Sequence, residues 1–133
     1  MILYIIRHGE TEWNKMGKMQ GKTDISLSED GRKLAQKTAD GLKNIKFDYI
    51  FSSPLERAYE TACIIKGDRD IEIVKDERLI EVGFGLYEGT VVDERKSPKK
   101  GVAVSANRKR LKILCKYKQN LAIGIKVEKY RKL

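Results

Sequence analysis

The sequence has few cysteine, histidine, proline and tryptophan residues, and these shortages exclude several classes of protein. Its 133 residues include two cysteines, one histidine, two prolines and one tryptophan. Cys63 and Cys115 form no CxxC pair, which argues against a disulfide framework or a structural zinc site and favours a reducing compartment. We expect Cys63 to be a small core residue. No apolar run approaches the roughly 20 residues of a membrane span, and no basic segment precedes the N-terminal apolar run, as it would in a signal peptide. We therefore expect a cytoplasmic protein with no membrane partner, no metal site and no cofactor.

The charge is distributed unevenly along a chain that is long enough for one domain. The net charge is +9, but residues 1–90 hold 14 basic and 16 acidic side chains, whereas residues 91–133 hold 14 and 3. The sequence therefore predicts two regions, a domain-forming part in residues 1–90 and a basic tail in residues 91–133.

The N-terminal stretch MILYIIRHGETEWN joins an apolar run to a polar cluster. Residues 2–6 are apolar and mostly β-branched, which predicts a strand covered on both faces in a parallel sheet. The run ends at Arg7, His8 and Gly9, at the edge where open α/β sheets bind their ligands. This position favours a functional role for His8 over the alternative, a histidine that only ends a strand.

The residues that follow this strand suit a phosphate ligand. A ring nitrogen of His8 is a competent nucleophile toward phosphorus, and the Arg7 guanidinium can hold phosphoryl oxygens by two parallel hydrogen bonds. Gly9 allows the backbone to approach closely, and Thr11 and Asn14 add neutral donors. The segment therefore predicts a phosphate-binding site.

A helix is predicted between Ser28 and about Asn44. Ser28 is a favoured N-cap, and two acidic residues follow it in the first turn, where the helix dipole stabilises negative charge. An apolar stripe at helical spacing is formed by Leu34, Ala35, Thr38, Ala39 and Leu42. We expect this stripe to pack on the sheet.

A second strand and a second helix follow. Residues 47–51 predict the strand, and Ser53 as N-cap with Pro54 at the first position predicts the helix start. The expected buried face of that helix consists of Leu55, Ala58, Ala62 and Ile65. Because crossover connections make the two strands parallel, their carboxyl ends share one edge, which places Arg57 near His8. The alternative is a surface ion pair between Arg57 and an acidic neighbour.

A third strand, predicted over residues 71–74, leads to a candidate general acid. A departing alkoxide must be protonated, and a carboxyl group beside apolar residues can keep its proton near neutral pH. Glu81, followed by VGFG, suits this role. Glu77 and Glu88 are competing candidates.

Three segments resemble one known family. RHGETEWN resembles the signature of the histidine phosphatase superfamily, which includes phosphoglycerate mutases and many phosphomonoesterases. SSPLERAYETA is similar to the family's SSPLxRAxxTA segment, whose arginine, here Arg57, binds the phosphoryl group. DERLIEVGFGLYEG resembles RLxE followed by FGxxEG, which makes Glu81 the proton donor and acceptor. The resemblance also implies that Gln20, Gly21 and Asp24 line the substrate pocket.

The resemblance implies an α/β fold, namely the three-layer phosphoglycerate mutase-like fold with a mainly parallel sheet, incomplete on its C-terminal side. The expected reaction is a double displacement on a small phosphorylated metabolite. His8 attacks phosphorus, Arg7, Arg57 and Asn14 stabilise the transferring charge, and Glu81 protonates the leaving oxygen. Water then hydrolyses the phosphohistidine.

Two other functions stay open. A phosphoglycerate mutase would return the phosphoryl group to a different oxygen with the same residues, although FGLYEG is more similar to the phosphatases. A noncatalytic remnant is also possible, because the family's second catalytic histidine, in a late HG motif, has no counterpart in a chain whose one histidine is His8.

The family motifs end near Gly89, and the sequence pattern of the basic tail that follows does not predict a single secondary structure. Residues 106–121 are compatible with a basic helix and residues 121–127 with a short strand. The charge would attract nucleic acid, but Tyr117 and Tyr130 are the only aromatic residues available for stacking, so nucleic acid binding is not expected. The abrupt change of composition favours a truncated or frameshifted reading frame as its origin. The sequence does not indicate the oligomeric state.

Overall fold

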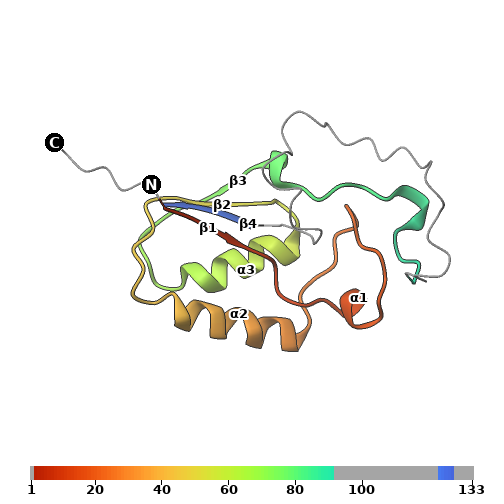
Figure 1. Ribbon diagram of the computed structural model, residues 1–133, viewed down its shortest axis with the longest axis horizontal. Coiled ribbons are helices and arrows are strands. Elements are labelled where there is room, and N and C mark those ends of the chain that lie inside the picture. Colours follow the sequence, from red (N-terminus) through yellow and green to blue (C-terminus); the bar gives the residue numbers. More distant parts are fainter. Residues whose placement is uncertain (1, 92–122, 128–133) are drawn as a thin grey trace.

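The computed structural model describes residues 2–91 and 123–127. The elements are ordered β1 (Ile2–Ile6), α1 (Glu12–Lys15), α2 (Glu29–Gly41), β2 (Ile50–Ser52), α3 (Glu56–Lys66), β3 (Ile73–Lys75), the 3₁₀ helices η1 (Glu77–Leu79) and η2 (Gly85–Tyr87), and β4 (Ile123–Val127) (Figure 1). The expected basic helix over residues 106–121 lies outside the described residues.

The strands form one sheet in the order β1-β4-β2-β3. β4 pairs antiparallel with both β1 and β2, and β2 pairs parallel with β3. β1, β2 and β3 therefore share one direction, which confirms the mainly parallel sheet. The strand from the basic tail lies between β1 and β2, so these two strands are parallel to each other without being neighbours.

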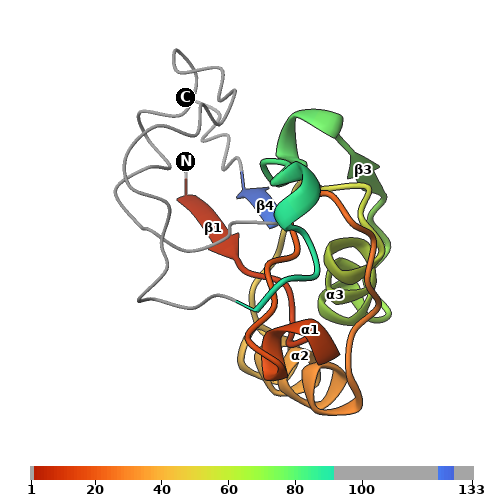
Figure 2. The same ribbon diagram turned by 90° about the vertical axis from the view of Figure 1, so that its right-hand side faces the viewer.

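Helices α2 and α3 pack against each other and cover the same face of the sheet (Figures 1 and 2). The buried core between the layers consists of Ala39, Phe47, Ile50, Ala58, Ala62 and Ile65. Tyr4 of β1 reaches this core and meets the Phe47 ring edge-on, with the ring centroids 5.7 Å apart. Four of these core residues, Ala39, Ala58, Ala62 and Ile65, belong to the apolar stripes predicted for the two helices.

Contrary to expectation, no element among the described residues covers the other face of β1. Leu3 and Ile5, whose side chains point to this face, are 51% and 43% exposed, and Ile2 at the start of the strand is 55% exposed. Both long helices of the described part lie on the opposite face, so only Tyr4 and Ile6 of β1 pack against the core. Within the described residues, one helical layer therefore accompanies the sheet.

The start of α2 agrees with expectation, but its end and its buried stripe differ. The Ser28 hydroxyl caps the helix by accepting a hydrogen bond from Gly31 N at 3.1 Å. The helix ends at Gly41, before Asn44, and Leu34 is 56% exposed. Leu34 is exposed because the small residues on the adjacent face, Gly31, Ala35 and Ala39, make the close packing.

Helix α3 begins later than predicted. Ser53 and Pro54 precede it, and the N-cap position belongs to Leu55, which makes no side-chain cap. Instead, Asp24 Oδ1 accepts a hydrogen bond from Glu56 N at 2.7 Å, so a carboxylate from a distant loop caps this helix. Cys63 is exposed on α3 rather than buried in the core, because the buried face of the helix runs through Ala58, Ala62 and Ile65.

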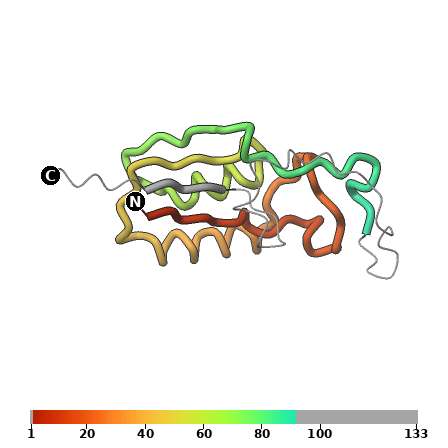
Figure 3. The backbone as a smooth tube through the Cα atoms, turned by 45° about the horizontal axis from the view of Figure 1, so that its top comes forward, coloured from red at the N-terminus to blue at the C-terminus, as the bar shows by residue number. Residues whose placement is uncertain are grey.

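The loops that follow β1 and β3 gather at one end of the molecule (Figure 3). The backbones of the two loops are joined there, with Met19 N donating to Thr90 O at 3.0 Å and Gly89 N donating to Met19 O at 2.8 Å. Across residues 2–91 and 123–127 we find no helix with the length and apolarity needed to cross a bilayer.

Candidate active site

His8 lies at the end of β1 and is buried, with 7% of its surface exposed. Its Nδ1 lies 2.6 Å from the carbonyl oxygen of Gly9. A carbonyl oxygen only accepts hydrogen bonds, so Nδ1 carries the proton and Nε2 keeps its lone pair. Burial lowers the pKa of His8 to about 4, the bond to Gly9 opposes this shift, and the charges of Arg57 and Arg7 add to it. The imidazole is therefore neutral at pH 7, as a nucleophile must be.

Two close contacts hold the loop that carries His8. Gly9 N donates to Thr61 Oγ1 at 3.0 Å, and the Thr61 hydroxyl donates to Arg57 O at 2.7 Å. A Cβ atom on Gly9 would lie 2.5 Å from Gly31 O, and one on Gly31 would lie 2.0 Å from Glu10 O. The loop thus approaches α2 backbone to backbone, which only glycine allows at these positions. Neither Thr61 nor Gly31 was among the predicted site residues, although Thr61 belongs to the SSPLERAYETA segment.

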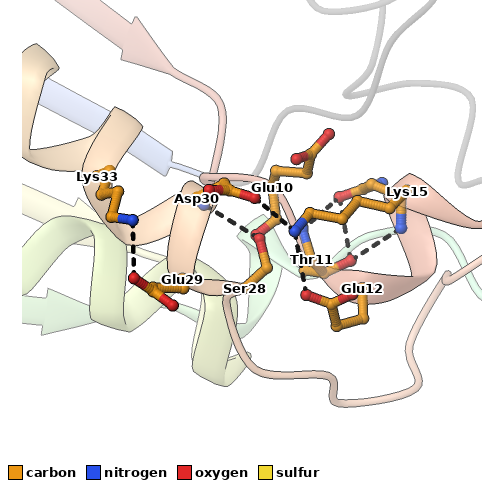
Figure 4. A network of polar contacts seen from close by, with 10 residues as sticks. Glu10, Thr11, Glu12, Lys15, Ser28, Glu29, Asp30 and Lys33 are labelled. Carbon is orange, nitrogen blue, oxygen red and sulfur yellow. Dashed lines mark hydrogen bonds and ion pairs between the residues drawn. The ribbon is translucent and has the colours of Figure 1, made fainter.

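The same loop is tied to the first turn of α2 (Figure 4). Glu10 O accepts hydrogen bonds from Ser28 N at 2.8 Å and from Ser28 Oγ at 3.1 Å. Lys15 Nζ lies 2.6 Å from Asp30 Oδ2 and 3.3 Å from Glu12 Oε1. The ion pairs are exposed and contribute little to stability. The bonds to the Glu10 carbonyl are the ones that fix the loop on the helix.

Asn14 and Gln20 meet at Thr11. Asn14 Oδ1 accepts from Thr11 N at 3.0 Å, and Thr11 Oγ1 accepts from Asn14 N at 3.2 Å, which together cap the short helix α1. Gln20 Nε2 donates to Thr11 Oγ1. Gln20 Oε1 is buried without a hydrogen-bond partner among the described residues. Both predicted ligands are therefore held near the end of β1 by one hydroxyl group.

Arg57 lies in the first turn of α3 and is 1% exposed. Its Nη1 donates to Thr23 O at 2.9 Å and its Nη2 donates to Gly21 O at 2.7 Å. Nε is buried and has no partner within the part of the chain that the structure describes. Burial lowers the pKa of Arg57, and the charges of Asp24, Glu81 and Glu88 act in the opposite direction. Arg57 is therefore not part of a surface ion pair. It is a buried guanidinium whose charge acts on His8.

The three candidate acids have different environments. Glu81 is half-buried, its Oε1 accepts from Val82 N at 2.9 Å, and its charge acts on Arg57. Glu77 is exposed in η1. Burial raises the pKa of Glu88, but hydrogen bonds from Thr23 and from backbone amides outweigh it and lower that pKa to about 2. Glu88 is thus ionised at neutral pH and has no proton to donate.

Arg7 is exposed at the end of β1, and Gly21 is buried with a positive φ of 58°. In contrast to Arg7, five predicted site residues are buried at this edge of the sheet: His8, Gly9, Gln20, Gly21 and Arg57.

Among the described residues no group of three or more His, Cys, Asp or Glu side chains is placed to hold a metal ion.

Comparison with known proteins agrees with this geometry. The model of the histidine phosphatase superfamily (branch 1) matches residues 3–112, and so extends past the motifs that end near Gly89. Phosphoserine phosphatase 1 of Hydrogenobacter thermophilus is 42% identical over 69% of this chain and 44% of its own length. Fructose-2,6-bisphosphatase TIGAR of Xenopus tropicalis is 44% identical over 71% of this chain and 36% of its own.

Solved structures give the same result. Bacillus stearothermophilus YhfR superposes with a TM-score of 0.65 and 41% identity, covering 71% of this chain and 46% of that one. Phosphoserine phosphatase of Entamoeba histolytica, in complex with 3-phosphoglyceric acid, gives a TM-score of 0.61 and 44% identity over 71% of this chain and 46% of that one. The chain therefore spans less than half the length of these relatives and has the phosphoglycerate mutase-like fold over the matched part. On the family match over residues 3–112, this chain belongs to branch 1 of the histidine phosphatase superfamily.

Proposed function

We propose that the chain is a phosphomonoester hydrolase that works through a phosphohistidine on His8, with residues 1–90 forming the N-terminal part of its catalytic domain. The observation that carries this proposal is the environment of His8. Its Nδ1 is committed to the Gly9 carbonyl, its pKa is lowered to about 4, and the buried Arg57 acts on it from nearby. A neutral nucleophile beside a buried cation suits attack on a dianionic phosphate ester.

The reaction proceeds in two displacements. Nε2 of His8 forms a bond to phosphorus while the P–O bond of the ester breaks, and Glu81 gives its proton to the departing alkoxide. Water then attacks phosphorus, the P–N bond breaks, and Glu81 accepts the proton of that water. Arg57, Arg7 and Asn14 stabilise the charge of the transferring group in both steps.

The rest of the site binds the phosphoryl group and the substrate. The loop at Gly9 brings the backbone close to the reacting group, and Gln20 and Gly21 line the pocket beside Arg57. Gln20 Oε1, buried without a partner among the described residues, offers an acceptor for a substrate hydroxyl or amine.

A small acidic phosphomonoester is the proposed substrate class. The similar proteins of Hydrogenobacter thermophilus and Entamoeba histolytica described above are named phosphoserine phosphatases, and the second was solved with 3-phosphoglyceric acid. The mutase alternative is favoured by other relatives, since phosphoglycerate mutase-like protein 4 of Arabidopsis thaliana is 39% identical over 80% of this chain. The family's second catalytic histidine has no counterpart among these 133 residues, whose single histidine is His8.

The test is single-turnover labelling of the folded protein with a ³²P-phosphomonoester. Acid-labile phosphate on His8 that decays in water is the expected result, and His8→Asn should show none. Adding 3-phosphoglycerate during the decay separates the two reactions, because a mutase transfers label to it whereas a hydrolase releases inorganic phosphate. Folded wild-type protein that acquires no label would overturn the proposal and favour a noncatalytic remnant.

A further inference from the structure

Glu88 holds the loop that contains Gly21, Lys22 and Thr23 by hydrogen bonds to one carboxylate. Oε1 accepts from Lys22 N at 3.0 Å and from Phe84 N at 2.8 Å. Oε2 accepts from Thr23 N at 2.7 Å and from the Thr23 hydroxyl. These four donors come from two segments more than 60 residues apart in the chain. The carboxylate therefore joins the loop at Gly21 to the segment that contains η2.

The opposite side of the same loop faces Arg57. Gly21 O and Thr23 O accept hydrogen bonds from the two terminal nitrogens of the guanidinium, at 2.7 and 2.9 Å. Gly21 O and Lys22 N belong to a single peptide unit, in which C=O and N–H point in opposite directions because the bond is trans. This peptide lies between a cation on its carbonyl side and an anion on its amide side. Each charge strengthens the bond made by the other, because both polarise the same peptide.

The backbone at Gly21 is shaped for this arrangement. Its φ is 58°, and a Cβ atom there would lie 2.1 Å from Glu88 Oε1. Any side chain would therefore push the carboxylate off the Lys22 amide. Because Glu88 is ionised, it offers acceptors to all four donors at once.

We propose that Glu88 is a positioning residue that orients the Arg57 guanidinium toward the phosphoryl group through the Gly21–Lys22 peptide. The inference rests on the proposed function, since it assigns Arg57 to the phosphoryl group. The two carbonyls fix the rotation of the guanidinium and so decide where its remaining N–H groups point, including the buried Nε that has no partner among the described residues. Without Glu88, the loop and the guanidinium lose their common orientation.

The test is Glu88→Gln, which keeps the shape of the side chain but removes the charge and places an NH₂ group among four donors. We expect kcat/KM to fall on the order of 10²-fold, mainly through KM, because a misplaced binding group weakens ground state and transition state together. Glu72→Gln, at an exposed position, is the matched control and should keep wild-type values. Thr23→Val removes one of the four bonds and should give a smaller fall in the same direction, even if Glu88→Gln does not fold.

Leaving-group dependence separates positioning from acid catalysis. A positioning role predicts an equal loss on p-nitrophenyl phosphate, whose leaving group needs no proton, and on an alkyl phosphate. A loss confined to the alkyl phosphate would make Glu88 a proton donor and overturn the inference, as would values within twofold of wild type for both variants.

A ligand-free measurement keeps this inference distinct from the proposed function. In the wild type, the Arg57 Nε–H and the Lys22 amide should exchange slowly with solvent by NMR, and in Glu88→Gln both should exchange at least tenfold faster. Unchanged exchange in the variant overturns the positioning role, whereas slow exchange in a wild-type protein that acquires no phosphohistidine label overturns only the proposed function.

Discussion

The hydrophobic core under the sheet and the edge of the sheet that carries the candidate site, with His8, Arg57 and the loops at Gly9 and Gly21, are both buried. Different interactions stabilise these two regions. In the core, Ile50, Ala58 and Ile65 are fully buried apolar side chains whose stabilisation grows with the area removed from water. At the edge, the buried side chains include Arg57 and His8, and each depends on one or two specific partners. An apolar contact tolerates a substitute of similar volume, whereas an unpaired buried polar group costs its full desolvation.

The two regions also differ in how far apart their partners lie in the sequence. Much of the core comes from neighbouring turns of α3 and from the strand before it, although Ala39 of α2 and Tyr4 of β1 also reach it. At the edge, Gly9 bonds Thr61 over 52 positions, Arg57 bonds Gly21 over 36, and Lys22 bonds Glu88 over 66. The edge therefore depends on contacts between segments far apart in the chain, whereas the helix faces are encoded locally.

We expect that a substitution at the edge can lower catalytic activity without unfolding the core. Replacing Arg57 by lysine keeps one charge but loses the two-pronged contact with Gly21 O and Thr23 O, so kcat/KM should fall on the order of 10³-fold, about 4 kcal/mol. Steady-state kinetics and thermal denaturation measure the two effects separately. The control is Arg69→Lys, because Arg69 donates to Ile65 O, Lys66 O and Leu42 O at helix ends and should affect stability alone. Equal losses of activity in both variants would contradict the assignment of Arg57.

The core, in turn, can be weakened without changing the chemistry. Ile50→Ala removes a fully buried side chain, so the free energy of unfolding should fall by roughly 3 kcal/mol. Urea titration measures this, with Leu86→Ala, at a position 99% exposed, as the control that should change it by less than about 0.5 kcal/mol. The KM of the protein that remains folded should stay within about twofold, because Ile50 belongs to the core cluster and not to the candidate site.

The edge should make the stability of the protein depend on pH, which an apolar core does not, because His8 is buried in its neutral form. Its pKa falls from 6.5 to about 4 on folding, so the unfolded chain binds more protons between these values and the folded state loses stability as the pH decreases through this window. Between pH 7.5 and 4.5 the wild type should lose about 2 to 3 kcal/mol more than His8→Gln, as measured by urea titration at each pH. A difference under about 0.5 kcal/mol would show that His8 titrates normally in the fold.

Sequence reasoning located the parts of the site that depend on strand direction. The placement of Arg57 beside His8 required only that β1 and β2 be parallel, which the antiparallel β4 between them preserves. Predictions of helix caps and buried positions from neighbouring residues were less accurate, because residues distant in the sequence also determine them. The predicted Ser53 cap was wrong because Asp24 caps α3 instead. Cys63 was expected in the core and is exposed, because it lies beside the buried face that Ala58, Ala62 and Ile65 form on α3 and not on it.

The sequence by itself determined the apolar faces of the helices, the direction of β1, β2 and β3, and the residue types available for phosphoryl chemistry, because these depend on periodicity and on short segments. Only the tertiary structure decided the state of those residues. It buried His8 against the Gly9 carbonyl and set the Gly21–Lys22 peptide between Arg57 and Glu88. It also turned Glu88 from a candidate acid into an ionised hydrogen-bond acceptor. The reason is that protonation and orientation depend on burial and on partners tens of residues away, which no local pattern contains.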